Sequence, residues 1–234
     1  MPQNNDTTPA DVAAPAATDG PAAVPPTSLT ALSCVSFASE LASRKPVPGG
    51  GGAAAYVGAL AAALCSMVGN FTVGKPRYAD VEADVRRAMA QADAARDDLL
   101  SLVDDDARAY ALVSAAYALP RDAAGRVAAI QAALPEAARP PLAIIEASAR
   151  AVEALEVLGQ KGSRILQSDV ACGAAMAVAA MRAASVSVYV NTALIDDPLI
   201  ARGLDERCDA LLGEWVPRAE ALLDSFVGGL RKES

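Results

Sequence analysis

The chain has 234 residues, of which 53% are hydrophobic but only 4% aromatic. This balance favours closely packed helices over sheets, because strands prefer aromatic and β-branched side chains. The formal net charge of −8 argues against nonspecific binding to nucleic acid or to anionic membranes, both of which need a basic face.

No histidine occurs in the chain. Ser-His-Asp and Cys-His catalysis are therefore excluded, and the commonest transition-metal ligand is missing, so we expect no metal site. The four cysteines form no CxxC pair and lie in apolar, helix-like surroundings. They are expected to be free, buried thiols in a reducing compartment such as the cytoplasm.

Residues 1–28 are rich in proline, alanine, threonine and aspartate and have neither helical nor strand periodicity. This composition is typical of a disordered tail. The segment also lacks the basic start and apolar run of a secretory signal. We expect a Pro/Ala-rich tail over 1–28 and one helical domain over 29–234.

Helical periodicity starts at Leu29, where Ser28 is placed to cap the first helix. The chain then has no charge between Lys45 and Lys75, a length sufficient to cross a membrane. Glycine and alanine dominate this stretch, however, and small residues recur at every fourth position over 54–62, which lets another helix approach closely. We interpret it as a buried central helix rather than a membrane span.

The remaining elements follow from periodicity and proline positions. An amphipathic helix is predicted from Tyr78 to Leu119, with a kink at the aspartate triplet Asp104–Asp106. Ser168-Asp169 is placed to cap the next-to-last helix, and either Asp196 or Asp197, followed by Pro198, is placed to start the last one. The sequence predicts an all-α bundle of about seven helices with a long central apolar helix, the later helices covering residues 122–134, 142–158, 168–194 and 197–227.

The sharpest local motif is Pro46–Ala55, in which four glycines lead into an alanine-rich helix. Bare amides at a helix N-terminus favour anions and carbonyl oxygens, although the same motif could be a hinge. At the other end of the helix, Lys75 and Arg77 suit a carboxylate such as a glutamate tail, or mark a solvated turn. Asp106 and Tyr110 share a helix face, which would set a carboxylate beside a phenol, or form an exposed acidic patch.

Two further polar sites admit both a structural and a functional reading. Ser168 and Asp169 are explained by helix capping. Asn191 lies near the end of a mostly apolar helix and needs a hydrogen-bond partner if it is buried.

These pieces occur together, and in this order, in one family. The chain resembles the cyclodeaminase/cyclohydrolase family of folate enzymes over about residues 33–230. The matching segments are PVPGGGGAAA at 46–55, GALAAALCSMVGNFTVGKPRYADVE at 58–82, LVDDDARAY at 102–110, SD at 168–169 and VYVN at 188–191.

The resemblance implies an all-α homodimer that acts on the N5–N10 bridge of tetrahydrofolate. Methenyltetrahydrofolate cyclohydrolase activity, in which water opens the bridge to give 10-formyltetrahydrofolate, is preferred because no formiminotransferase domain accompanies the match. Formimidoyltetrahydrofolate cyclodeaminase activity, which releases ammonia, is the alternative. A catalytically silent folate-binding relative and a purely structural scaffold are the rival readings. No cofactor is implied beyond the folate substrate, in its monoglutamyl or polyglutamylated form, and neither nucleic acid nor membrane is an expected partner.

By the same resemblance, Asp106 is the first candidate for the catalytic carboxylate and Asp104 the second. The implied substrate-binding residues are Gly49, Gly50, Gly51, Lys75, Arg77, Tyr110, Ser168, Asp169 and Asn191. The chain departs from the family where relatives carry Gly-Asn-x-Asn, here Gly159–Arg164, and at Ser187, where relatives carry asparagine. These departures bear on substrate choice and on activity itself.

Overall fold

The structure is a computed structural model that describes residues 28–231, so the predicted tail lies outside the described residues except for Ser28. Within this range there are six α-helices and three 3₁₀ turns, and no strand. The helices are α2 (Cys34–Leu41), α3 (Gly50–Asn70), α4 (Glu82–Ala118), α5 (Arg126–Lys161), α6 (Gln167–Thr192) and α7 (Pro198–Leu230), and the turns are η1 (Leu29–Ala31), η2 (Pro76–Val81) and η3 (Arg164–Leu166).

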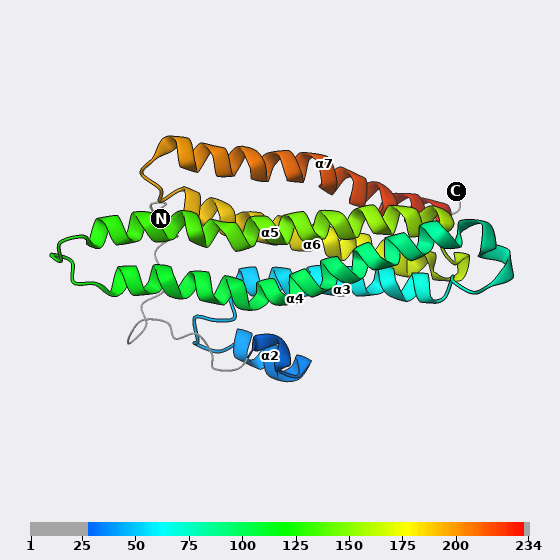
Figure 1. The fold of residues 1–234 in the computed structure, drawn as a ribbon, viewed down its shortest axis with the longest axis horizontal. Coiled ribbons are helices and arrows are strands. Elements are labelled where there is room, and N and C mark those ends of the chain that lie inside the picture. The colour runs from blue at the N-terminus through cyan, green and yellow to red at the C-terminus, as the bar shows by residue number, and fades with distance from the viewer. Residues whose placement is uncertain (1–27, 232–234) are drawn as a thin grey trace, which may run out of the picture.

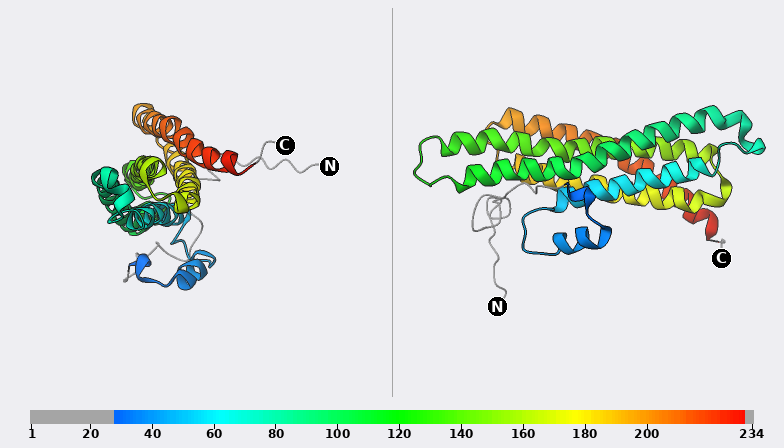
Figure 2. Two further views of the ribbon diagram at one scale, coloured as in Figure 1. Left: turned by 90° about the vertical axis from the view of Figure 1, so that its right-hand side faces the viewer. Right: turned by 60° about the horizontal axis from the view of Figure 1, so that its bottom comes forward.

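Helices α3 to α6 form a long four-helix bundle, with α7 packed along α5 and α6 and the short α2 standing beside the bundle (Figure 1). The end-on view shows α3 and α6 as neighbours, with α2 below them and α7 above (Figure 2). The all-α bundle predicted from the sequence is therefore confirmed.

Small side chains allow the helices to approach closely. Ala54, Gly58 and Ala62 are buried, as their four-residue spacing predicts. A Cβ atom at Gly58 would lie 2.9 Å from the Ser148 Oγ of α5 and 3.0 Å from a methyl group of Leu99 of α4. Close contact between backbones thus replaces the large aromatic side chains that this chain lacks.

Helix α5 is continuous, whereas the sequence analysis predicted two helices separated by Pro140-Pro141. The helix contains Pro135, Pro140 and Pro141. A proline removes one backbone N–H and crowds the carbonyl four residues earlier, which usually breaks a helix. Here both flanks are held in the core, where Leu134 and Ile145 are fully buried, and packing overrides the local preference. The merger of these two segments explains why six helices are found rather than about seven.

The side chain of Asn191 compensates for one of these prolines. Pro141 has no N–H to offer the carbonyl of Ala137, four residues earlier. The Nδ2 atom of Asn191 on α6 donates to that carbonyl at 3.5 Å and to the Ser187 carbonyl at 2.7 Å. The proline therefore frees an acceptor that ties α5 to α6.

The N-cap residues that the structure shows agree with the predicted ones only in part. Ser28 accepts from the Thr30 N–H, but it caps only η1, because Ser33 then caps a separate helix α2. Ser168 caps nothing: α6 begins at Gln167, directly after η3, and its first turn has no side-chain cap. Asp169 lies in that first turn, where the positive end of the helix dipole favours a carboxylate.

Helix α4 runs unbroken through the aspartate triplet, so the predicted kink at Asp104–Asp106 is wrong.

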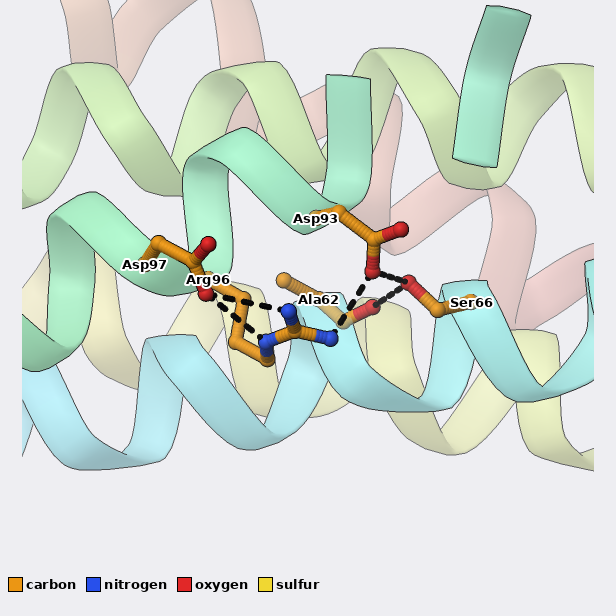
Figure 3. A network of polar contacts seen from close by, with 5 residues as sticks. All are labelled: Ala62, Ser66, Asp93, Arg96 and Asp97. Carbon is orange, nitrogen blue, oxygen red and sulfur yellow. Dashed lines mark hydrogen bonds and ion pairs between the residues drawn. The ribbon is translucent and has the colours of Figure 1, made fainter. Parts of the chain in front are cut away.

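A polar network joins the first half of α4 to α3 (Figure 3). The Asp93 carboxylate accepts a hydrogen bond from the Ser66 hydroxyl, with 2.8 Å between the two oxygens. It also forms an ion pair with the Arg96 guanidinium, with 2.8 Å between nitrogen and oxygen. Arg96 also contacts the carboxylate of Asp97.

Two helices, α3 and the segment Arg164–Thr192, are long and apolar enough to cross a membrane by length and composition. In the bundle, 61% and 50% of their most apolar windows are buried against the other helices. Helix α3 is therefore the central apolar helix that the sequence predicts, and one side of it remains exposed.

All four cysteines are free, as predicted, but only Cys65 and Cys208 are buried. Cys34 and Cys172 are exposed, which corrects the expectation that all four thiols lie in the core. Both exposed cysteines lie on an outer side of a helix whose opposite side supplies the buried contacts.

The start of α7 provides a test of local stability. Asp197 Oδ1 accepts hydrogen bonds from the N–H groups of Leu199 and Ile200, and Pro198 occupies the first helical position, as predicted. Asp197→Ala removes these acceptors and should lower the free energy of unfolding by about 1 kcal/mol, measured by chemical denaturation. The neighbouring Asp196→Ala keeps the cap and serves as control; an equal loss in both variants would contradict the assignment.

Candidate functional site

A cavity of about 240 Å³ opens where the N-terminus of α3 meets α4, α5 and the C-terminal end of α6. The lining combines polar groups on α3, α4 and α6 with aliphatic side chains on α4, α5 and α6. The lining residues are Pro46, Val47, Gly49, Gly50, Gly51, Asp106, Tyr110, Val113, Ala137, Val186, Ser187, Val190 and Asn191.

The carboxylate of Asp106 lies directly against the first turn of α3. A Cβ atom at position 51 would lie 2.1 Å from Asp106 Oδ1, so only glycine permits this approach. The N–H of Gly52 donates a hydrogen bond to the same carboxylate. The glycine run therefore has a steric function besides its exposed amides, because it makes room for an acid on the neighbouring helix.

Burial raises the pKa of Asp106 to about 6, and the hydrogen bond from Gly52 partly opposes this rise. At neutral pH the side chain is ionised, yet its charge is costly in the absence of a positive partner. A carboxylate in this state is suited to accept a proton or to lie beside a cationic ligand.

The first turn of α3 supplies hydrogen-bond donors to the same pocket. Gly49 is the N-cap residue, and no side chain caps the helix. The N–H of Gly52 is bonded to Asp106, while the N–H groups of Gly50 and Gly51 have no acceptor within the helix. These two donors stand at the positive end of the helix dipole, where they favour a carbonyl or an anionic edge of a ligand.

Tyr110 and Asn191 are the other polar side chains of the lining considered as ligand contacts. Tyr110 lies one turn after Asp106 on α4, and burial raises the pKa of its phenol, which stays protonated at neutral pH. Asn191 uses its Nδ2 atom for the carbonyls of Ala137 and Ser187, so its side-chain oxygen is the acceptor available to a ligand. Among the predicted site residues, the pocket thus brings together Asp106, Tyr110, Asn191 and the three glycines Gly49–Gly51.

Asp104, the second catalytic candidate, does not line this pocket. Its carboxylate accepts a hydrogen bond from the Ser28 hydroxyl at 2.5 Å and one from the Leu29 N–H at 2.8 Å. Asp105 forms an ion pair with Arg108 on the surface of α4. The three consecutive aspartates therefore have three different environments, and only Asp106 reaches the cavity.

The remaining predicted site residues lie at the opposite end of the bundle. Helix α3 has 21 residues and is therefore roughly 30 Å long, which separates Lys75 and Arg77 from the pocket. Ser168 and Asp169 lie at that same distant end, in the first turn of α6. Within one chain, these four residues are therefore remote from Asp106.

At this distant end, each of the two cations lies against an aromatic ring. Lys75 Nζ lies 5.8 Å from the ring centre of Phe71, and the Arg77 guanidinium lies 4.7 Å from that of Tyr78. Arg77 also lines a separate cavity of about 1130 Å³. Neither cation takes part in an ion pair in the part of the chain that the structure describes.

Sequence reasoning missed the aliphatic residues of the lining. Val113 follows Asp106 by seven residues, and Val186 and Val190 are four apart, so helical spacing could have placed them on the pocket face. Ala137 could not have been found in this way, since its segment was predicted to end near the prolines. Ser187 was noted only as a departure from the family, and it lies in the lining.

The described residues contain no group of three His, Cys, Asp or Glu side chains arranged to hold a metal ion. The functional groups that line the pocket are a buried carboxylate, a phenol, an amide oxygen and backbone N–H groups.

Comparison with known proteins gives a consistent picture. The sequence model of the formiminotransferase-cyclodeaminase family matches residues 33–210. A methenyltetrahydrofolate cyclohydrolase from Methylorubrum extorquens is 38% identical over 182 residues, which cover 76% of this chain and 88% of that protein. A formimidoyltransferase-cyclodeaminase from Rattus norvegicus is 34% identical over 206 residues, but this chain spans only 38% of the rat protein. The crystal structure of formiminotetrahydrofolate cyclodeaminase from Thermotoga maritima superposes with a TM-score of 0.76 at 32% identity, covering 85% of this chain and 99% of that one.

The raised pKa of Asp106 predicts a pH-dependent stability. Since the folded-state pKa is about 6 and the ordinary value is 3.8, the folded state is penalised as the pH rises through this window, and the full penalty applies above it. Asp106→Asn should therefore be more stable than the wild type by about 1–3 kcal/mol at pH 7.5 and should lose this advantage near pH 4. Chemical denaturation at both pH values measures the difference.

The exposed neighbour Asp105 provides the control, because Asp105→Asn removes the same charge from the surface. This variant should show no gain at pH 7.5. A stability of Asp106→Asn that is equal to that of the wild type at both pH values would contradict the burial of the charge.

Proposed function

The chain belongs to the formiminotransferase-cyclodeaminase family, and from this premise we propose that it is a methenyltetrahydrofolate cyclohydrolase. In this reaction water opens the N5–N10 methenyl bridge of tetrahydrofolate to give 10-formyltetrahydrofolate. The relative that carries this name is 38% identical, and the match extends over 88% of its length.

The single observation that supports this chemistry best is the buried carboxylate of Asp106 in a pocket whose lining carries no cation. The methenyl bridge is an amidinium cation, and the pocket lining contains one acid and no lysine or arginine. A cationic bridge beside Asp106 would recover the electrostatic energy that burial of the carboxylate costs. The site is thus complementary in charge to the reacting carbon.

We assign the general base to Asp106. Its carboxylate takes one proton from water as the water oxygen bonds to the bridging carbon. The bond from this carbon to N5 then breaks, N5 takes up a proton, and the formyl group stays on N10 while one proton leaves for solvent. General base catalysis contributes about 10²–10⁴-fold, which is sufficient for a carbon already activated by its own positive charge.

The N–H groups of Gly50 and Gly51 and the side-chain oxygen of Asn191 are assigned to the pterin. Donors on α3 and an acceptor on α6 lie on either side of the cavity, which suits a heterocycle with both kinds of group on its edge. Ser187 contributes a short hydroxyl where relatives carry an amide, so the pocket has more space at this corner.

Formimidoyltetrahydrofolate cyclodeaminase activity is the alternative, and it is favoured by the structural similarity to the Thermotoga maritima enzyme over 99% of that chain. The same pocket would serve this reaction, since N10 attacks a cationic formimino carbon on N5 and ammonia leaves. A silent folate-binding relative is the remaining alternative. We also propose a homodimer in the cytoplasm that uses no cofactor besides its folate substrate.

Absorbance of the methenyl chromophore distinguishes the two activities. With methenyltetrahydrofolate as substrate, the wild type should accelerate the loss of this absorbance. With 5-formiminotetrahydrofolate, growth of the same band would instead assign the cyclodeaminase, and binding without any change would assign a silent relative. Asp106→Asn should lower kcat by about 10²–10⁴-fold while the protein stays folded.

The pH profile adds a second test of the same residue. The value of kcat/KM should fall below a pH of about 6 as free Asp106 is protonated. The corresponding limb of kcat should lie at lower pH, because the bound cation stabilises the carboxylate. Near-native turnover by Asp106→Asn would remove Asp106 from the mechanism. So would a pH profile of Asp106→Asn that is the same as that of the wild type.

Two neighbouring glycines test the geometry of the base. Gly51→Ala places a Cβ atom on the carboxylate of Asp106 and should lower kcat/KM by about 100-fold, as expected for a displaced catalytic group. Gly52→Ala is the matched control, because its Cβ would meet its nearest neighbours at an ordinary 3.6 Å. Equal rates for the two variants, with folding verified by circular dichroism, would contradict the steric role of Gly51.

A further inference from the structure

The proposed reaction needs an acid as well as a base. When the bond from the bridging carbon to N5 breaks, its electron pair goes to N5, and this nitrogen must take up a proton. In the same step the hydroxyl group that water has left on the carbon must lose its proton, so that the formyl carbonyl can form. Two proton transfers in opposite directions, at two different atoms, are served best by two side chains.

The pocket lining contains two titratable side chains, Asp106 and Tyr110, and they differ in protonation state. Asp106, with a pKa of about 6, is ionised at neutral pH and is ready to accept a proton. Burial raises the pKa of the Tyr110 phenol, so this group holds its proton at neutral pH. The environment of the pocket thus separates a proton acceptor from a proton donor, as it does in sites that use one group as base and another as acid.

The other side chains of the lining that carry a polar hydrogen are Ser187 and Asn191. The Nδ2 atom of Asn191 is engaged with the carbonyls of Ala137 and Ser187. Neither an amide nor an alcohol is among the groups that usually act as catalytic acids, whereas a phenol is. The lining formed by the described residues contains no lysine or arginine. With Asp106 as the base, Tyr110 is therefore its best proton donor.

The hydroxyl group of Tyr110 is free to meet a ligand. The ring is half-buried and packs against the main hydrophobic core, which holds it in place. Burial alone shifts the pKa of the phenol, and no hydrogen bond to this hydroxyl group occurs among residues 28–231. Because Tyr110 follows Asp106 by one turn of α4, the two groups stand side by side on the helix face that borders the cavity.

We propose that Tyr110 is the general acid of the reaction and that its phenol protonates N5 as the bridge opens. This inference rests on the proposed function, which supplies both the bond that breaks and the base. A catalytic role for the hydroxyl group also explains why a polar side chain is placed on this core-facing side of α4 without a partner in the protein.

The proton transfers balance over one turnover. Asp106 takes the first proton from water as the carbon–oxygen bond forms, and this proton leaves for solvent. Asp106 then takes the hydroxyl proton of the adduct, the bond between carbon and N5 breaks, and N5 receives the phenol proton of Tyr110. Transfer of the proton from Asp106 to the phenolate, one helical turn away, restores both groups. One proton is released for each methenyl bridge that is opened.

Tyr110→Phe provides the first test, because it keeps the ring and removes only the hydroxyl group. The value of kcat should fall by about 100-fold while KM stays nearly unchanged, since the proton is transferred only in the transition state. Tyr117→Phe is the matched control: Tyr117 is also a half-buried tyrosine of α4, but it packs in a different cluster and lies outside the pocket lining. This variant should retain the wild-type kcat.

A fluorinated tyrosine distinguishes an acid from a structural phenol and keeps the whole side chain in place. Fluorine lowers the pKa of a phenol, so incorporation of 3,5-difluorotyrosine at position 110 should move the alkaline limb of kcat to lower pH. The same residue at position 117 should leave the limb where it is in the wild type. The loss of methenyl absorbance is followed after subtraction of the uncatalysed hydrolysis at each pH.

The outcomes separate this inference from the proposed function. Near-native kcat in Tyr110→Phe, or an alkaline limb that the fluorinated residue does not move, would overturn the inference while the wild type still hydrolyses methenyltetrahydrofolate. A wild type that acts only on 5-formiminotetrahydrofolate would instead overturn the cyclohydrolase proposal. The role of Tyr110 is then read from the same variants with that substrate, where the phenol would protonate the departing ammonia. If the wild type acts on neither substrate, both proposals fall.

Discussion

The contact between Asp106 and the first turn of α3 is the constraint on which the candidate site depends. Two helices can bring a carboxylate and a row of backbone N–H groups to the same place only if no side chain separates them. Gly51 meets this condition, and Gly52 then donates to the acid. Because Gly51 has no Cβ atom, the Asp106 carboxylate can be buried against α3. Its raised pKa and its position in the pocket follow from this burial.

The same use of small side chains runs through the bundle. Where Gly58 passes between Leu99 and Ser148, the backbones approach to a distance that a Cβ atom would prevent. Close packing of this kind fixes the relative position of α3, α4 and α5, and it thereby sets the pocket at their common end. The alanine-rich composition is therefore linked to the site through geometry rather than through chemistry.

Much of this arrangement could be predicted from the residues. Periodicity gave the helices, and the one-turn spacing of Asp106 and Tyr110 gave a shared face that the structure contains. The continuity of α5 could not be predicted, because local rules treat Pro140-Pro141 as a break, whereas burial of the flanks decides the outcome. Nor could spacing assign different partners to Asp104 and Asp106, since that depends on which helix lies opposite each one. The distance between Lys75 and the pocket is likewise a property of the bundle and not of the motif.

The hydrogen bonds that join Ser28 and Leu29 to Asp104 have a practical consequence for protein engineering. Ser28 and Leu29 are hydrogen-bonded to a side chain only two positions from Asp106. A reporter or purification handle joined just before Ser28 would begin beside α4. Handles intended to be inert are better joined after Arg231, which follows α7 at the other end of the bundle (Figure 1).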